Sequence, residues 1–125
     1  MENSIQSLTV LYVSDLNRSS HFYQTVYGCE VTDWWALRND DIKLGFKLIQ
    51  SDPASWVAPK PGLSHAYGYT EDIESLNRLF EEWKEKGVGV VQEPQSMQMN
   101  WGTWREFYVK DPDGYVLGMG SAEHN

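Results

Sequence analysis

Residues 13–23 of the chain are VSDLNRSSHFY, and this stretch predicts a change from strand to helix. The residues before it, 5–13, are rich in β-branched and aromatic types, which favour a strand. Asp15 is a typical N-cap residue, and apolar side chains then recur at helical spacing until Gly28, which is typical of a helix end. The fold is therefore expected to begin with a strand followed by a helix.

A second copy of this pattern begins 57 residues later. The matched pairs are Asp15 with Asp72, Leu16 with Ile73, Phe22 with Leu79 and Tyr23 with Phe80. Near the end of each half, residues 42–46 match residues 115–119 at a shift of 73, and both segments have the pattern of a terminal strand. Because caps, packing residues and terminal strands all recur, the sequence predicts an internal duplication.

Each copy continues into further strands. The remaining predicted elements are strands at 29–37 and 42–49, a linker at 51–62, a strand at 63–70, a helix from Asp72 to Gly87, and strands at 88–91, 103–110 and 115–120. The proline-containing linker separates module one, residues 5–50, from module two, residues 63–121, within a single domain of residues 1–125. The predicted fold class is α+β, with two tandem βαβββ modules.

The charge balance excludes several classes of partner. Lysine and arginine number 10 against 18 aspartates and glutamates, so the net charge is −8. This charge repels phosphate backbones and anionic lipids, so neither nucleic acid nor a membrane is expected as a partner.

No apolar run approaches the roughly 20 residues of a membrane helix, and the first residues lack signal-peptide features, which favours a cytoplasmic protein. The one cysteine, Cys29, excludes an intramolecular disulfide and a thiolate zinc site.

Two stretches, together with the duplication, resemble the vicinal oxygen chelate superfamily. They are residues 13–23, quoted above, and residues 101–115, WGTWREFYVKDPDGY. The superfamily comprises glyoxalase I, the extradiol dioxygenases, the fosfomycin resistance enzymes and the bleomycin resistance proteins. The resemblance covers nearly the whole chain and implies curled mixed sheets around a cleft, with the helices outside. It also implies that a second subunit commonly completes the cleft, so a homodimer is expected.

The resemblance also implies where a metal would bind. Enzymes of the superfamily hold a divalent metal through one residue on the first strand and one on the last strand of each module. The positions that match here are Leu8, Gly45, His65 and Gly118. Only His65 can ligate, and a Lewis-acidic cation needs about three protein ligands. No metal or other cofactor is therefore expected, although Glu106 is a conceivable second donor.

Strand alternation assigns candidate ligand-binding side chains to the enclosed faces of the two sheets. These candidates are Tyr12, Trp35, Lys43, Lys47, His65, Tyr67, Tyr69, Trp101, Trp104, Glu106 and Tyr108. Trp34 and Trp35 are adjacent on one predicted strand, so they should point to opposite faces. Residues 97–101, with two methionines and a tryptophan, suit a ligand-gripping loop or a surface loop. The glycines at the metal positions either open volume for a planar ligand or ease close packing.

These features favour a metal-independent binding protein of the bleomycin resistance type, which sequesters an aromatic or drug-like small molecule in a cleft lined by tryptophan and tyrosine. No nucleophile with its base and no nucleotide-binding motif is present, so no catalytic residue is assigned. Two alternatives remain open. One is a divergent metal-dependent lyase, isomerase or dioxygenase, or a metal-free catalyst with His65 as base. The other is a relative whose cleft is filled by its own side chains.

Overall fold

The computed structural model describes residue 5 and residues 7–125, which form two α-helices and eight β-strands. The elements are β1 (Thr9–Val13), α1 (Leu16–Thr25), β2 (Glu30–Thr32), β3 (Trp35–Asn39), β4 (Lys43–Gln50), β5 (Ala66–Tyr69), α2 (Ile73–Glu85), β6 (Gly89–Met99), β7 (Gly102–Lys110) and β8 (Val116–His124). The caps predicted at Asp15 and Asp72 are confirmed, because each side chain accepts a backbone N–H of the first helical turn. Gly28 and Gly87 follow the helices with φ of 78° and 87°, as helix-ending glycines do.

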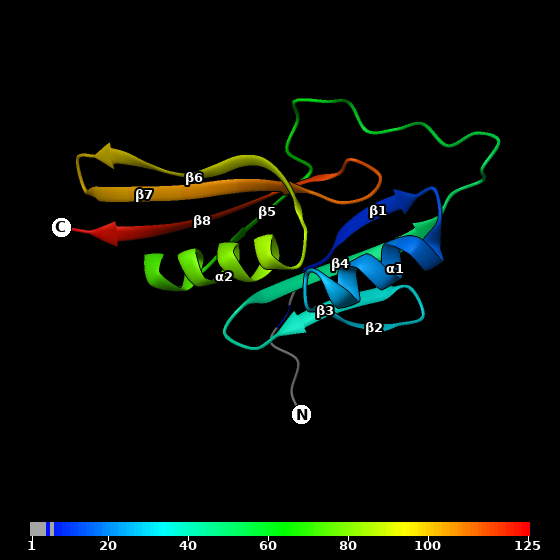
Figure 1. Cartoon of the computed structure of the whole chain (residues 1–125), viewed down its shortest axis with the longest axis horizontal. Helices are drawn as coiled ribbons and strands as arrows, with labels where there is room; N and C mark the ends of the chain where they lie inside the picture. The colour runs from blue at the N-terminus through cyan, green and yellow to red at the C-terminus, as the bar shows by residue number, and fades with distance from the viewer. Residues whose placement is uncertain (1–4, 6) are drawn as a thin grey trace.

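The strands form two sheets of four, one for each half of the chain. Sheet A has the order β1-β4-β3-β2, and sheet B has the equivalent order β5-β8-β7-β6. In each sheet the first and last strands of the module are parallel neighbours, and the other pairs are antiparallel. The predicted duplication is therefore confirmed. Figure 1 shows the two modules side by side, with the linker after β4 making a long excursion before β5.

The prediction of one strand over residues 29–37 is wrong. The structure has two strands there, β2 and β3, which pair antiparallel through a tight turn at Asp33 and Trp34. Asp33 has a φ of 50°, a left-handed conformation that aspartate adopts more readily than most residues. Trp34 lies in this turn and not on a strand, so the expected alternation of Trp34 and Trp35 does not apply. Their rings lie on the same side, with centroids 6.3 Å apart.

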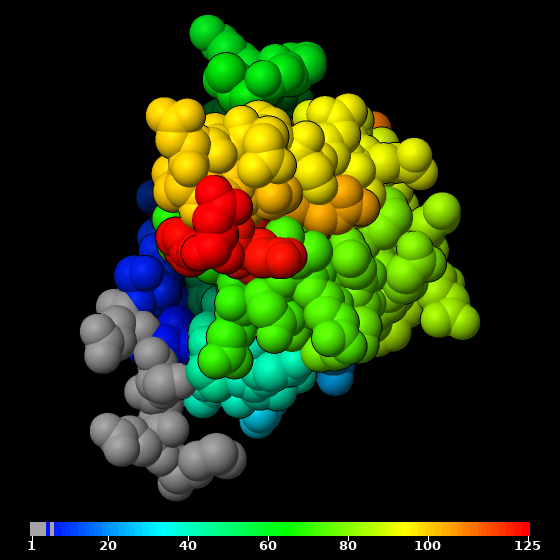
Figure 2. All heavy atoms as spheres, turned by 90° about the vertical axis from the view of Figure 1, so that its left-hand side faces the viewer, coloured from blue at the N-terminus to red at the C-terminus, as the bar shows by residue number. Residues whose placement is uncertain are grey.

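Module two has longer strands than predicted. Strand β6 continues to Met99 and β8 continues to His124, so both extend past the ends predicted at residues 91 and 120. Two irregularities in the β6–β7 register, one of them spanning Pro94, let β6 continue through a polar sequence. The expected loop at residues 97–101 is therefore corrected: Met97 and Met99 lie in β6, and only Asn100 and Trp101 form the turn. Figure 2 looks at the end of the molecule that holds this turn and the C-terminus.

The two modules share one core. Trp83 of α2 is fully buried, and its ring lies 4.7 Å from that of Tyr27 in module one and 5.8 Å from that of Phe107 in module two. Arg38 of β3 reaches Glu82 of α2 at 2.7 Å, which adds an ion pair across the same boundary. The modules are therefore held together inside one chain. Within the part of the chain that the structure describes, no helix is long and apolar enough to cross a membrane.

A second link joins the modules near the start of α1. The carboxylate of Asp113, in the turn between β7 and β8, accepts the backbone N–H and the hydroxyl of Ser14 at 2.9 and 2.6 Å. Arg18 donates to the same carboxylate at 2.6 Å. The adjacent Asp111 accepts the hydroxyl of Tyr23 at 2.8 Å. These contacts tie the first helix of module one to the last hairpin of module two.

Candidate functional site

The face of sheet B turned away from α2 carries a cluster of aromatic side chains, which we call the aromatic face. It is formed by Tyr67 and Tyr69 of β5 and by Trp104, Glu106 and Tyr108 of β7. Phe107 and Val109 of β7 lie in the core, so alternation along the strand points Trp104, Glu106 and Tyr108 the other way. The ring of Tyr67 contacts the other three rings, and Tyr69 also contacts Trp104, with centroids 6.0–6.3 Å apart. Five of the predicted site residues are thus brought together.

Glu106 lies at the centre of the aromatic face and accepts three hydrogen bonds. All three go to one carboxylate oxygen, Oε2, from the hydroxyl of Tyr67, the indole Nε1 of Trp104 at 3.2 Å and the hydroxyl of Tyr108 at 3.2 Å. Among the described residues, no donor reaches the other oxygen, Oε1. The carboxylate is therefore fixed by its surroundings and keeps one oxygen available as an acceptor.

The two tyrosines act as donors in this cluster. Burial and the hydrogen bond to Glu106 raise the pKa of Tyr67 well above its usual value. Burial, followed by the negative charge of Glu106, also raises the pKa of Tyr108. Both hydroxyls therefore stay protonated at neutral pH, and each directs its proton to the carboxylate.

Strand β8 forms the floor of the aromatic face and has small residues where the rings lean over it. Gly118 pairs with Tyr67 on one side and with Tyr108 on the other. A Cβ on Gly118 would lie 2.6 Å from ring carbons of both tyrosines, and one on Gly120 would overlap the ring of Trp104. Gly45 in sheet A is covered in the same way, by Leu8 and Ile5. Of the two alternatives left open for these glycines, the contacts favour close packing over opened volume, because the chain's own side chains lie where a Cβ would be.

Substituting alanine for Gly118 should therefore displace the two tyrosine rings. We expect the free energy of unfolding to fall by about 1–3 kcal/mol, the usual cost of forcing an extra methyl group into a packed site. Gly89→Ala is the matched control, since its Cβ would meet only the flexible side chain of Lys110 at 3.0 Å or more. Urea unfolding and near-ultraviolet circular dichroism measure both effects. Equal stabilities and unchanged aromatic spectra for the two variants would contradict this packing.

The predicted site residues of module one lie on a different surface, the face of sheet A turned away from the core. Lys47 has its Nζ 5.9 and 5.2 Å from the ring centroids of Trp34 and Trp35. Lys43 donates its Nζ to the backbone carbonyl of Asp40. Tyr12 is exposed on the same face. These side chains are separate from the aromatic face, so the single cleft expected from the sequence is not assembled by their contacts.

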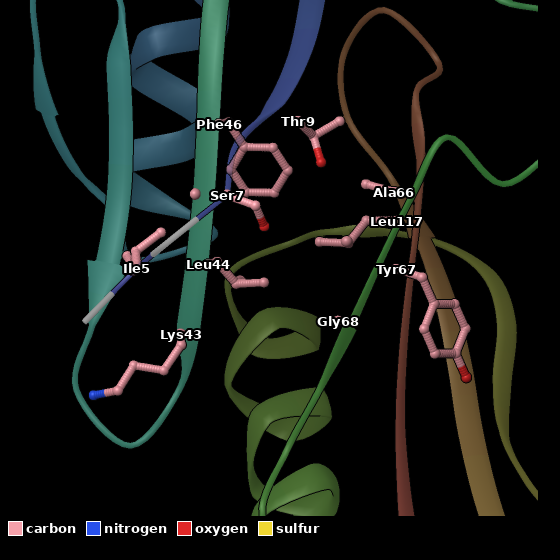
Figure 3. Close-up of a pocket in the computed structure, with 11 residues that line it drawn as sticks. Ile5, Ser7, Thr9, Lys43, Leu44, Phe46, Ala66, Tyr67, Gly68 and Leu117 are labelled. Atoms are coloured by element: carbon pink, nitrogen blue, oxygen red, sulfur yellow. The ribbon is translucent and has the colours of Figure 1, made fainter. Parts of the chain in front are cut away.

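One pocket connects the two modules. It has a volume of about 210 Å³ and is bordered by both Lys43 and Tyr67, together with Gly45 and Gly68. Figure 3 shows that the Lys43 and Tyr67 side chains point away from each other, out of this pocket. The pocket is therefore a seam between β4 and β5, and it does not join the two predicted groups into one site.

A hollow that the sequence did not indicate adjoins the aromatic face. It has a volume of about 310 Å³ and lies between the end of the linker and sheet B. Its lining residues are Gly62, Leu63, Ser64, Val91, Gln92, Tyr108 and Val116. Tyr108 lines the hollow and also belongs to the aromatic face, so the two features adjoin. Sequence patterns gave no signal for this hollow, because the path of a linker depends on distant contacts.

His65 and Trp101 are held by local contacts. The Nδ1 atom of His65 accepts the backbone N–H of Val116 at 2.9 Å, and its ring packs edge-on against Tyr115. Because Nδ1 accepts a hydrogen bond, the proton of the neutral imidazole is on Nε2, which is then a donor. Trp101 lies in the β6–β7 turn with its ring 5.0 Å from that of His124.

The donor set does not fit the metal that the superfamily resemblance implies. Three of the four matched positions, Leu8, Gly45 and Gly118, have no donor atom, and the tautomer of His65 leaves Nε2 without a lone pair for a cation. Glu106 keeps only Oε1 available, and one carboxylate oxygen falls short of the three or so protein ligands that a metal site needs. No group of three or more histidine, cysteine, aspartate or glutamate side chains suited to a metal occurs among the residues that the structure describes. We therefore assign no step to a metal.

Comparison with known proteins shows which family has this architecture. Residues 5–119 match the family model of the Glyoxalase/Bleomycin resistance protein/Dioxygenase superfamily. A lactoylglutathione lyase of Neisseria meningitidis serogroup A is 30% identical over 123 residues, covering 87% of this chain and 84% of the relative.

Solved structures agree on the fold. A glyoxalase/bleomycin resistance protein/dioxygenase from Alicyclobacillus acidocaldarius superimposes with a TM-score of 0.71 at 19% identity, covering 96% of this chain and 92% of the other. TnmS3, an antibiotic binding protein from Streptomyces sp. CB03234, gives a TM-score of 0.64 at 22% identity, with 96% and 98% covered. The chain belongs to the Glyoxalase/Bleomycin resistance protein/Dioxygenase superfamily.

Proposed function

We propose that this chain is a metal-independent binding protein that sequesters an aromatic or drug-like small molecule on the aromatic face. The observation that carries the proposal is the arrangement of four aromatic rings around one fixed carboxylate. Rings offer large apolar contact area, and the adjoining hollow gives a ligand a place to enter. TnmS3 shares the fold and is an antibiotic binding protein, so the fold is compatible with this role.

A second copy of the chain would complete the site. Each sheet has one face that no helix covers. Both of these faces carry exposed large apolar side chains: Val10, Tyr12 and Trp34 on module one, and Tyr67, Tyr69, Met97 and Met99 on module two. Uncovered apolar surface of this kind is typical of an interface. The proposal therefore includes a homodimer held together by these exposed apolar side chains.

Ligand binding can be tested at Trp104 directly. We expect a planar aromatic antibiotic to shift the indole N–H resonance of Trp104 in a nuclear magnetic resonance titration, because that group lies at the centre of the aromatic face. The resonance is assigned with a Trp104→Phe variant, and the indole of buried Trp83 is the internal control. If a broad panel of aromatic compounds leaves the Trp104 resonance unmoved, the proposed function is wrong.

A second candidate is catalysis of the kind named for the Neisseria relative, a lactoylglutathione lyase. The 30% identity favours it, and the donor set described above opposes it. The assay is lactoylglutathione lyase activity after incubation with nickel, zinc, manganese or ferrous iron. Activity that requires about one metal per chain, and that is lost in His65→Ala, would establish this candidate and overturn the proposed function.

A further inference from the structure

The aromatic face has an uneven distribution of charge that restricts its ligand. Glu106 contributes a carboxylate at the centre, and the oxygen Oε1 accepts no hydrogen bond from the described part of the chain. Tyr67, Trp104 and Tyr108 each donate to this carboxylate, and Tyr69 packs against the rings of Tyr67 and Trp104. The faces of aromatic rings are electrostatically negative and attract cations. The ring faces and the carboxylate therefore both favour a positively charged ligand.

We propose that the aromatic face binds the ammonium group of a cationic organic molecule, with Oε1 of Glu106 as its hydrogen-bond acceptor and counter-charge. This inference rests on the proposed function and specifies the class of ligand. The three donors on Oε2 hold the carboxylate in place, so little side-chain freedom is lost when a cation binds Oε1. An aliphatic amine that carries an aromatic ring satisfies both parts of the site, since its ring packs on the exposed rings while its ammonium group meets Glu106.

No lysine or arginine in the described part of the chain forms an ion pair with Glu106. Lys47 lies over Trp34 and Trp35, and Lys43 donates to the carbonyl of Asp40, both on sheet A. On sheet B, Lys110 is four residues further along β7, about 13 Å away at the usual rise of a strand. The net charge of −8 attracts cations to the whole molecule. The geometry and the overall charge thus agree on a cationic ligand.

Three probes of nearly equal size test this inference: 3-phenylpropylamine as the cation, 3-phenyl-1-propanol as the neutral molecule and 3-phenylpropionate as the anion. Dissociation constants come from the shift of the Trp104 indole resonance at neutral pH. We expect the amine to bind at least tenfold more tightly than the alcohol, because a hydrogen bond to a charged group is added. The propionate should bind more weakly than the alcohol. This comparison uses the wild-type protein alone.

A pair of variants isolates the charge of Glu106. Glu106→Gln keeps an oxygen acceptor for its three neighbours but removes the charge, so the amine should lose its tenfold advantage while the alcohol is unaffected. Glu93→Gln, an exposed change of the same charge on β6 beside α2, should leave both affinities unchanged.

The outcomes separate the two proposals. If the alcohol binds as tightly as the amine in the wild-type protein, this inference fails while small-molecule binding stands. If neither these three probes nor the aromatic panel shifts the Trp104 resonance, both proposals fail. If Glu106→Gln weakens the alcohol and the amine equally, Glu106 has a structural role only, and the inference is wrong. If Glu93→Gln weakens the amine as much as Glu106→Gln does, the preference comes from net charge, and the inference is equally wrong.

Discussion

Replacement of Trp83 by alanine is expected to lower the free energy of unfolding by about 3–5 kcal/mol, the usual cost of deleting a fully buried large aromatic side chain. Trp83 is 0% exposed and contacts rings from both modules, Tyr27 on one side and Phe107 on the other. The cavity left by alanine would therefore open at the boundary between the modules. Urea denaturation followed by far-ultraviolet circular dichroism gives the free energies.

Two further variants show which property of Trp83 matters. Trp83→Phe keeps an aromatic ring and removes an indole N–H that has no partner among the described residues, so it should cost less than half as much. Trp101→Ala is the control for loss of a tryptophan, because Trp101 is 41% exposed in the β6–β7 turn and should change stability by less than about 1 kcal/mol. Equal losses for Trp83→Ala and Trp101→Ala would mean that the modules do not share a core.

Local signals in the sequence predicted most of the fold. The caps at Asp15 and Asp72, the apolar spacing of the helices and the alternation of the strands all act over a few residues, so they survive in any tertiary context. The prediction of one strand over residues 29–37 failed because no such local signal marks the turn within it. The turn at Asp33 and Trp34 contains neither glycine nor proline, and its left-handed aspartate has no distinct pattern. The continuation of β6 beyond residue 91 was missed because Pro94 and its polar neighbours resemble a loop, whereas an edge strand tolerates them.

The grouping of side chains on the aromatic face was predictable, because it depends on strand alternation. Period two along β7 correctly grouped Trp104, Glu106 and Tyr108, and period two along β5 grouped Tyr67 with Tyr69. What fills the space above a glycine depends on side chains from neighbouring strands, so the sequence could not show that tyrosine rings cover Gly118. Likewise, nothing in a single sequence states whether the two sheets enclose a cleft within one chain.

Two buried tyrosines of the core offer a matched test of a single hydrogen bond. The hydroxyl of Tyr23 donates to the carboxylate of Asp111 at 2.8 Å, whereas the hydroxyl of Tyr27 has no partner among the described residues. Tyr23→Phe should therefore cost about 2–3 kcal/mol at neutral pH, because it leaves a buried carboxylate short of a donor. Tyr27→Phe removes an unpaired buried hydroxyl and should be neutral or stabilising by up to about 1 kcal/mol. Urea unfolding of the two variants measures the difference.

The loss in Tyr23→Phe should also depend on pH. Burial raises the pKa of Asp111 in the folded protein above its usual value, and the hydrogen bond from Tyr23 offsets part of that rise. A raised folded-state pKa means that the contribution of Asp111 to stability is greatest below its unfolded pKa and declines as pH rises through the folded pKa. Removing the Tyr23 hydroxyl raises the folded pKa further, so the loss should be largest at neutral pH and shrink near about pH 4. A loss that is the same at both pH values would show that Tyr23 does not stabilise the ionised carboxylate, and equal losses in Tyr23→Phe and Tyr27→Phe would show that ring packing alone matters.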